Sequence, residues 1–286
     1  MLEFFEHALR NLHAAGRKKF GDKWLVKLAV RREKLEQAYR SLYETDRDPI
    51  QYASLSARTA YVFAYAPTRA EYTREFLIRH RKAMGKALFG KGGISVVSFG
   101  GGPASELVGL IRYLEDPASE EAVDAVRFLV YDKDGDWEAV ADDVVSSLDT
   151  GIHVEIKYHR VDVVNKREMA EIDLADVDLV IFSYVMSELA KLETREEISA
   201  NFRSALAHLS LGSKILFIDN KHKIFIDYFR SCKLVLGLNQ QSDSGDSIVF
   251  DFPALTGTFG ILEKSLDWRP RTELNSVSKL IVRTRI

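Results

Sequence analysis

Residues 94–103, ISVVSFGGGP, run from a stretch rich in Ile and Val into three consecutive glycines and a proline. β-Branched residues suit a buried strand, whereas glycine lets the backbone turn sharply and approach a ligand closely. Beyond the glycines, Leu107, Leu110, Ile111 and Leu114 share one face of a helix. The stretch therefore predicts a strand, a tight turn and a helix in succession.

The same alternation continues to the end of the chain. Further apolar runs separated by helical stretches occupy residues 127–131, 154–161, 178–183 and 214–218. Such a pattern predicts a parallel sheet that helices cover on both faces. The last two runs, 248–252 and 278–285, have no convincing helix between them, so we expect them to pair as an antiparallel edge. The predicted fold class of residues 91–286 is α/β, with a Rossmann-like and mostly parallel sheet.

Residues 1–90 read instead as an α-helical N-terminal segment. Apolar residues recur at helical spacing at Trp24, Leu28, Leu35, Tyr39 and Leu42. Asp48-Pro49 interrupts this helix, and a short third helix is expected to stop at Pro67. Thr68 and Glu71 have the spacing of a capping box, which predicts a further helix from there to about Leu88.

Charge is distributed unevenly between these two regions. Residues 1–90 contain 18 Lys and Arg against 10 Asp and Glu, whereas the remainder contains 22 against 32. Basic groups at 17–19, 31–32 and 79–82 are interleaved with the aromatic residues Tyr52, Tyr61, Phe63, Tyr65 and Tyr72. Basic groups beside aromatic rings can bind phosphates and stack bases. The alternative is that these rings form the core of a helical lid over a small molecule.

The expected location of the protein is intracellular and cytoplasmic. The chain has one cysteine, Cys232, so no disulfide can form within it, and its first residues do not resemble a secretory signal. No apolar run reaches about 18 residues, which argues against a membrane span. The seven histidines lack the spacing of a zinc site, so no metal is expected.

Polar residues follow several of the predicted strands, where ligands bind in open α/β sheets. The glycines 100–102 and Pro103 come after the first strand, and free N–H groups at the start of the next helix favour a ligand carboxylate. Asp132 follows the second strand and suits the hydroxyls of a ribose, although Asp134 is near enough to take that role. Asp162 follows the third strand, where a carboxylate can accept a hydrogen from an adenine amino group.

Four stretches together resemble the class I, Rossmann-like S-adenosylmethionine-dependent methyltransferases: residues 96–103, 131–132, 160–163 and 178–189. The resemblance covers residues 91–286 and implies a seven-stranded sheet with S-adenosylmethionine as cofactor. The cofactor-binding residues that it implies are Gly100, Gly101, Gly102, Pro103, Asp132, Lys133, Asp162, Val163, Ser183 and Tyr184. One position departs from the family, because Ser98-Phe99 stands where many members carry an acidic residue. A non-catalytic binding protein with the same fold is therefore an alternative.

Methyl transfer from a sulfonium depends mainly on alignment, and a general base is needed only when the acceptor must lose a proton early. Glu188, His222 and Tyr184 are the candidate catalytic residues, since each follows a strand end on the expected active face. No motif in the sequence identifies the acceptor. The basic and aromatic residues of the N-terminal segment lead us to expect RNA, with a small molecule as the alternative. The chain lacks the Asn/Asp-Pro-Pro-Tyr/Phe motif that clamps a planar amino group in relatives, which disfavours an acceptor of that kind. Ser105 stands where an NAD-binding fingerprint has its third glycine, which disfavours an NAD enzyme.

Overall fold

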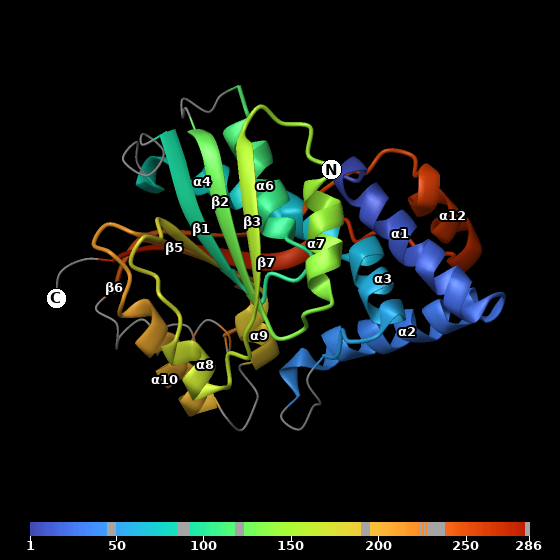
Figure 1. Ribbon diagram of the computed structural model, residues 1–286, viewed down its shortest axis with the longest axis horizontal. Helices are drawn as coiled ribbons and strands as arrows, with labels where there is room; N and C mark the ends of the chain where they lie inside the picture. Colours follow the sequence, from blue (N-terminus) through green and yellow to red (C-terminus); the bar gives the residue numbers. More distant parts are fainter. Residues whose placement is uncertain are drawn as a thin grey trace.

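The computed structural model describes residues 1–44, 50–84, 92–117, 123–189, 195–223, 225, 227 and 238–283. Its centre is a sheet of seven strands in the order β3-β2-β1-β4-β5-β7-β6 (Figure 1). The strands are β1 (Gly92–Phe99), β2 (Val123–Asp132), β3 (His153–Arg160), β4 (Leu179–Ser183), β5 (Lys214–Asn220), β6 (Leu238–Val249) and β7 (Glu273–Arg283). Strands β1 to β5 pair in parallel, and β7 is antiparallel to both β5 and β6. The expected Rossmann-like α/β fold is confirmed.

The connection between the last two strands differs from the prediction. Helix α12 (Gly257–Leu266) lies between β6 and β7, where no helix was expected. Its sequence contains two glycines in ten residues, which weakens the helical signal. The helix is held from outside, because the Glu6 carboxylate accepts hydrogen bonds from the main-chain N–H groups of Thr258 and Phe259, at 2.6 and 3.4 Å.

The two faces of the sheet are both buried, as alternation along the strands requires. One face, with Val96, Phe128 and Ile181, packs with residues of α4 (Ala66–Met84) and α6 (Ser105–Leu114). The opposite face, with Val97, Phe99 and Val180, packs with residues of α8 (Lys166–Ala170) and α10 (Arg195–Leu206). The short helix α9 (Val185–Leu189) directly follows the end of β4.

The remaining N-terminal helices form a group beside α7 (Trp137–Val145) (Figure 1). They are α1 (Glu3–Phe20), α2 (Lys23–Arg40), the 3₁₀ turn Ser41–Tyr43 and α3 (Leu55–Ala64). Helix α1 contacts α3, α7 and α12, and α2 contacts α3. Helix α4 differs from them, because it contacts α6, β6 and β7 and so belongs to the layer that covers the sheet.

Two predicted helix starts lie elsewhere in the structure. Helix α4 begins at Ala66, so Pro67 is in its first turn, where a missing N–H costs little. The Thr68 hydroxyl donates to the carbonyl of Arg271 and does not cap the helix. Helix α6 begins at Ser105 after a left-handed Ala104, which leaves Pro103 in the preceding turn. The predicted break at residues 48–49, the helix end at residue 88 and Cys232 lie outside the described residues.

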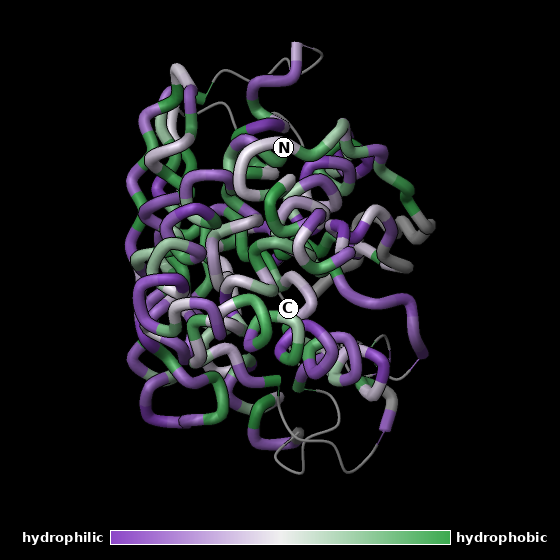
Figure 2. Tube along the Cα trace, turned by 90° about the vertical axis from the view of Figure 1, so that its right-hand side faces the viewer, coloured by the Kyte–Doolittle hydropathy of each residue, from purple (hydrophilic) through white to green (hydrophobic). Residues whose placement is uncertain are grey.

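Hydropathy along the chain follows this layered arrangement. Most helices alternate between hydrophilic and hydrophobic residues (Figure 2). Among the helices that the structure describes, none combines the length and the apolar character that a bilayer crossing requires.

The contact between α4 and α6 leaves no room for a side chain at Gly109. A Cβ there would lie 2.4 Å from the carbonyl oxygen of Ala70 and 2.7 Å from Cβ of Thr73. We expect Gly109→Ala to lower the free energy of unfolding by about 1–3 kcal/mol, despite alanine's better helix propensity. Thermal or denaturant unfolding measures this. Gly151→Ala is the control, because a Cβ there meets nothing within 4 Å; equal effects of the two variants would contradict the packing described.

Candidate active site

A cavity of about 270 Å³ lies at the carboxyl ends of β1, β2, β3 and β4. Eight of the residues predicted from the sequence line it: Gly100, Gly102, Asp132, Lys133, Asp162, Val163, Ser183 and Glu188. Four others, Gly101, Pro103, Tyr184 and His222, are not among its lining residues. The polar strand ends therefore converge on one space.

Parallel pairing produces this convergence. Phe99, the last residue of β1, is in register with Tyr131 of β2 and Phe182 of β4. Their rings stack side by side on one face, with centroids 5.5 and 5.2 Å apart, and His159 extends the row at 5.0 Å from Tyr131. The four rings form a row across β4, β1, β2 and β3, near the carboxyl ends of these strands.

The glycine turn adopts a backbone that other residues rarely allow. Gly100 and Gly102 have φ values of 64° and 46°. A Cβ on Gly100 would lie 2.9 Å from a methyl carbon of Val185, so the turn also packs closely against α9. The Gly100 N–H donates to the carbonyl of Tyr131 at 2.8 Å, which extends the strand pairing into the turn.

The Asp132 carboxylate links this turn to the end of β2. Its Oδ2 accepts the N–H of Gly102 at 3.1 Å, and its Oδ1 accepts the N–H of Asp134 at 3.0 Å. Burial raises the pKa of the Asp132 carboxyl to about 6, although both hydrogen bonds favour the charged form. Of the two aspartates that compete for the ribose role, only Asp132 lines the cavity.

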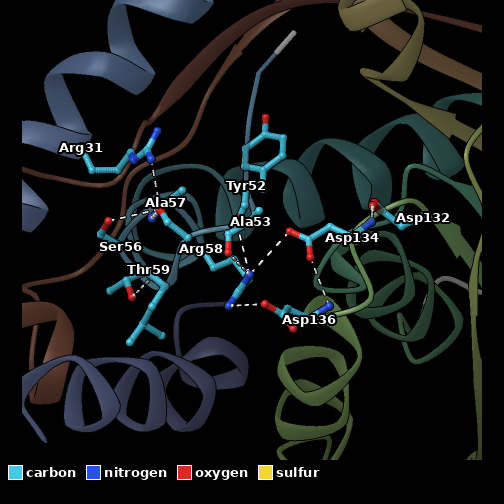
Figure 3. A network of polar contacts seen from close by, with 12 residues as sticks. Arg31, Tyr52, Ala53, Ser56, Ala57, Arg58, Thr59, Asp132, Asp134 and Asp136 are labelled. Atoms are coloured by element: carbon cyan, nitrogen blue, oxygen red, sulfur yellow. Dashed lines mark hydrogen bonds and ion pairs between the residues drawn. The ribbon is translucent and has the colours of Figure 1, made fainter. Parts of the chain in front are cut away.

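Asp134 has a structural partner instead (Figure 3). The Arg58 guanidinium, which belongs to α3, lies 3.5 Å from Oδ2 of Asp134 and 2.9 Å from Oδ2 of Asp136. It also donates to the carbonyls of Tyr52 and Ala53, at 3.3 and 3.1 Å. Arg58 thereby ties residues 50–53, which we call the strap, to the loop that follows β2.

The strap and α3 supply a wall of the cavity that the sequence did not predict. The strap contributes Ile50 and Tyr52 to the lining, and α3 contributes Tyr61. Trp137 of α7 lines the cavity next to them. The Tyr52 hydroxyl donates to Oε1 of Glu188 at 3.1 Å, which joins the strap to α9. The only signal in the sequence was the group of aromatic residues between positions 52 and 72.

Those aromatic residues belong to the interior. Tyr61, Phe63, Tyr65 and Tyr72 are each at most 6% exposed. The burial of these four rings agrees with the alternative reading of them as core, whereas Tyr52 is half-buried and lines the cavity. The four buried rings therefore do not support an RNA acceptor.

A second unpredicted group, Glu106, lies beneath the glycine turn. Its side chain, on the first turn of α6, is 3% exposed, and its Oε2 has no hydrogen-bond partner. Burial raises the pKa of the Glu106 carboxyl to about 6, with the nearby Ser183 hydroxyl and the Arg69 guanidinium acting in the opposite direction. The hydroxyl of Ser98 is also buried, without a hydrogen-bond partner among the described residues. Ser98 stands where an acidic residue was expected, and Glu106 brings a carboxylate to the same neighbourhood.

Two of the candidate catalytic residues lie away from the cavity. Tyr184 is buried in a left-handed conformation, with its hydroxyl 2.5 Å from that of Ser276. His222 is partly exposed, and its ring lies 5.5 Å from that of Phe225. Glu188 alone of the three contributes to the lining.

Comparison with known proteins gives likenesses of fold. Neither a protein-family model nor a curated protein matches the chain. Among solved structures, the CurJ carbon methyltransferase is similar at 10% identity over 96% of this chain and 71% of that chain, with a TM-score of 0.48. An O-methyltransferase family protein from Burkholderia thailandensis is similar at 12% identity over 93% and 74%, with a TM-score of 0.49. The N-methyltransferase NodS from Bradyrhizobium japonicum, solved with S-adenosyl-L-homocysteine, is similar at 10% over 87% and 99%, with a TM-score of 0.46.

The buried Glu106 carboxyl predicts a pH-dependent cost in the ligand-free protein. Its pKa rises from 4.5 to about 6 on folding, so its ionised form destabilises the fold above pH 6, and this cost disappears below pH 4.5. At pH 8, Glu106→Gln is therefore expected to raise the free energy of unfolding by about 2 kcal/mol, and at pH 4 to change it little. Denaturant unfolding at both pH values measures this. Glu138→Gln, at an exposed position of α7, is the control; a gain that does not depend on pH would contradict the burial argument.

Proposed function

We propose that the chain is a class I S-adenosylmethionine-dependent methyltransferase and that the cavity at the strand ends holds the cofactor. The observation that supports this most directly is the convergence of the glycine turn, Asp132, Asp162 and Ser183 on one cavity. These residues lie at the ends of β1, β2, β3 and β4, which are the strand ends that the resemblance assigns to the cofactor.

The described residues fit the nucleoside part of S-adenosylmethionine. Asp132 presents a carboxylate to the cavity from the end of β2, which suits the two hydroxyls of a ribose. Val161 and Val163 flank Asp162 in the lining, so that an adenine would contact apolar side chains beside one acceptor. Lys133 lies next to Asp132 on the exposed side.

The amino-acid part of the cofactor carries an ammonium group, and the structure offers it an unsatisfied acceptor. Glu106 is buried without an ion pair among the described residues, and it lies behind Ser183, which lines the cavity where Glu106 does not. The Arg69 guanidinium lowers the pKa of Glu106 without forming an ion pair with it, so a ligand cation would stabilise the ionised carboxyl further. Glu106 and Ser183 would hold the ammonium, which answers the missing acidic residue at positions 98–99. This favours a functional cofactor site over a merely vestigial fold.

When bound, S-adenosylmethionine supplies a methyl group on a sulfonium, which the lone pair of an acceptor displaces in line while the C–S electron pair leaves with sulfur. The chain's own residues align the reactants and exclude water. Tyr52 and Trp137 close the cavity with aromatic surface, and Arg58 keeps the strap in place. Glu188 is positioned to accept a proton from an acceptor, since its carboxylate lines the cavity and already accepts the Tyr52 hydroxyl.

A small-molecule acceptor under the helical segment is favoured over RNA. The strap and α3 cover the cavity, and their aromatic side chains are engaged in that cover. The basic residues Arg31 and Arg32 are also engaged, since they donate to Ser54 and to the carbonyl of Leu266 at 3.1 and 2.8 Å. In this proposal the N-terminal segment serves as a lid.

The cofactor assignment predicts how an Asp132 variant binds. Isothermal titration of the protein with S-adenosylhomocysteine should give saturable heat, and Asp132→Asn should weaken binding by about 10- to 100-fold, because hydrogen bonds to a charged carboxylate are lost. Asp149→Asn, at an exposed position, is the control, and circular dichroism checks that each variant is folded. Absence of heat with S-adenosylhomocysteine, together with binding of NAD, would overturn the assignment.

The lid assignment predicts the effect of releasing the strap. Arg58→Met removes the bonds to Tyr52 and Ala53 and the ion pairs to Asp134 and Asp136, while keeping an apolar side chain. We expect faster hydrogen exchange at residues 51–53 and about threefold to tenfold weaker binding of S-adenosylhomocysteine, because a preformed wall is lost. Arg10→Met, on the exposed side of α1, is the control. Unchanged affinity with a mobile strap would mean that the strap is not part of the binding site.

A further inference from the structure

A second cavity, of about 190 Å³, lies at the carboxyl ends of β4 and β5. Tyr184, which follows β4, and Asn220, which ends β5, form its floor, and Tyr39, Tyr65 and Arg271 line it from the helical segment and the start of β7. Arg69 of α4 lines both this cavity and the first one. The two spaces therefore share one buried wall.

The Arg69 side chain in this shared wall is charged, although it is only 5% exposed. Its Nη2 donates to the Tyr39 hydroxyl at 2.9 Å, and its guanidinium faces the rings of Tyr184 and Tyr61 at 4.4 and 5.0 Å. Its Nε has no hydrogen-bond partner. Within the described part of the chain, no carboxylate forms an ion pair with it, although a buried cation ordinarily requires one.

Arg271 is a second guanidinium on the same cavity, and unlike Arg69 it is exposed to solvent. It lies over the ring of Tyr65 at 6.0 Å from the centroid, and no described acidic residue forms an ion pair with it. The Tyr65 hydroxyl is buried beside Arg271, whose charge and hydrogen bond oppose the rise in the pKa of Tyr65 that burial causes. Of the two glutamates on this cavity, Glu36 already pairs with Arg32 and Arg40, at 3.4 and 3.9 Å. The cavity is lined by the guanidiniums of Arg40, Arg69 and Arg271 and by the carboxylates of Glu36 and Glu273.

We propose that this second cavity binds a small planar molecule carrying a carboxylate. A guanidinium presents parallel N–H donors that match the two oxygens of a carboxylate. The rings of Tyr39, Tyr65 and Tyr184 offer flat surfaces for a planar body. This anion site lies across Arg69 from the first cavity and does not depend on the proposed function.

Benzoate is a suitable probe, and benzamide is its uncharged counterpart of the same shape. Binding is followed by NMR at the Arg Nε–H signals, first in the ligand-free protein and then with saturating S-adenosylhomocysteine, which occupies the first cavity. A ligand of this size is expected to bind with a Kd of about 1 mM. We expect benzamide to bind at least tenfold more weakly and the Arg271 signal to shift with benzoate in both conditions.

Substitutions at Arg271 and Arg269 separate this site from general anion binding. Arg271→Gln should weaken benzoate binding at least tenfold and leave binding of S-adenosylhomocysteine unchanged. Its main-chain bonds to Ala64 and Thr68 do not depend on the side chain. Arg269→Gln is the matched control, because Arg269 is exposed and paired with Glu263 at 2.5 Å.

Each outcome decides one of the two proposals. Equal binding of benzoate and benzamide, or equal losses in Arg271→Gln and Arg269→Gln, would overturn the anion site. Absence of benzoate binding in a protein that binds S-adenosylhomocysteine would overturn it as well. Benzoate binding at Arg271 in a protein that does not bind S-adenosylhomocysteine would keep the anion site and reject the proposed function.

Discussion

Parallel pairing of β1 with β2 on one side and β4 on the other determines where the polar groups of this protein can lie. In a parallel pair all carboxyl ends face the same edge, so the residues that follow Phe99, Tyr131 and Phe182 necessarily meet there. Hydrogen bonds continue beyond the strands, from Gly100 to Tyr131 and from Tyr184 to Ile218, at 2.8 Å each. The turns of the site are thus extensions of the sheet.

The site holds its charged groups at an energetic cost in the ligand-free state. Asp132 and Glu106 are carboxyls whose pKa values burial raises to about 6, and Arg69 is a buried guanidinium. Cores avoid such groups unless each has a partner. The opposite charges of Arg69 and Glu106 offset part of this cost, since Arg69 lowers the pKa of Glu106. The buried ionised carboxyls therefore lower the stability of the ligand-free protein at this edge of the sheet.

The sequence was informative wherever a side chain's role followed from its position on a strand. Strand runs and their ends placed Gly100, Asp132 and Ser183 at the same cavity, because register carries such positions directly into space. It was uninformative about Glu106 and Arg69, since nothing in a helix sequence tells which face meets a cavity formed by other elements. It also missed α12, whose first turn is held by Glu6, more than 250 residues earlier in the chain. Long-range contacts of this kind leave no local pattern.

The wall formed by Trp137 gives the cavity a built-in optical reporter. The chain contains three tryptophans, and Trp137 is the one that lines the cavity. Trp24 is buried beside Phe20 and His13, and Trp268 packs beside Phe63, both within the helical group. Indole emission responds to the polarity and the stacking partners of its surroundings. Occupancy of this cavity would thus alter the intrinsic fluorescence of one identifiable residue, and the other two would supply a constant background.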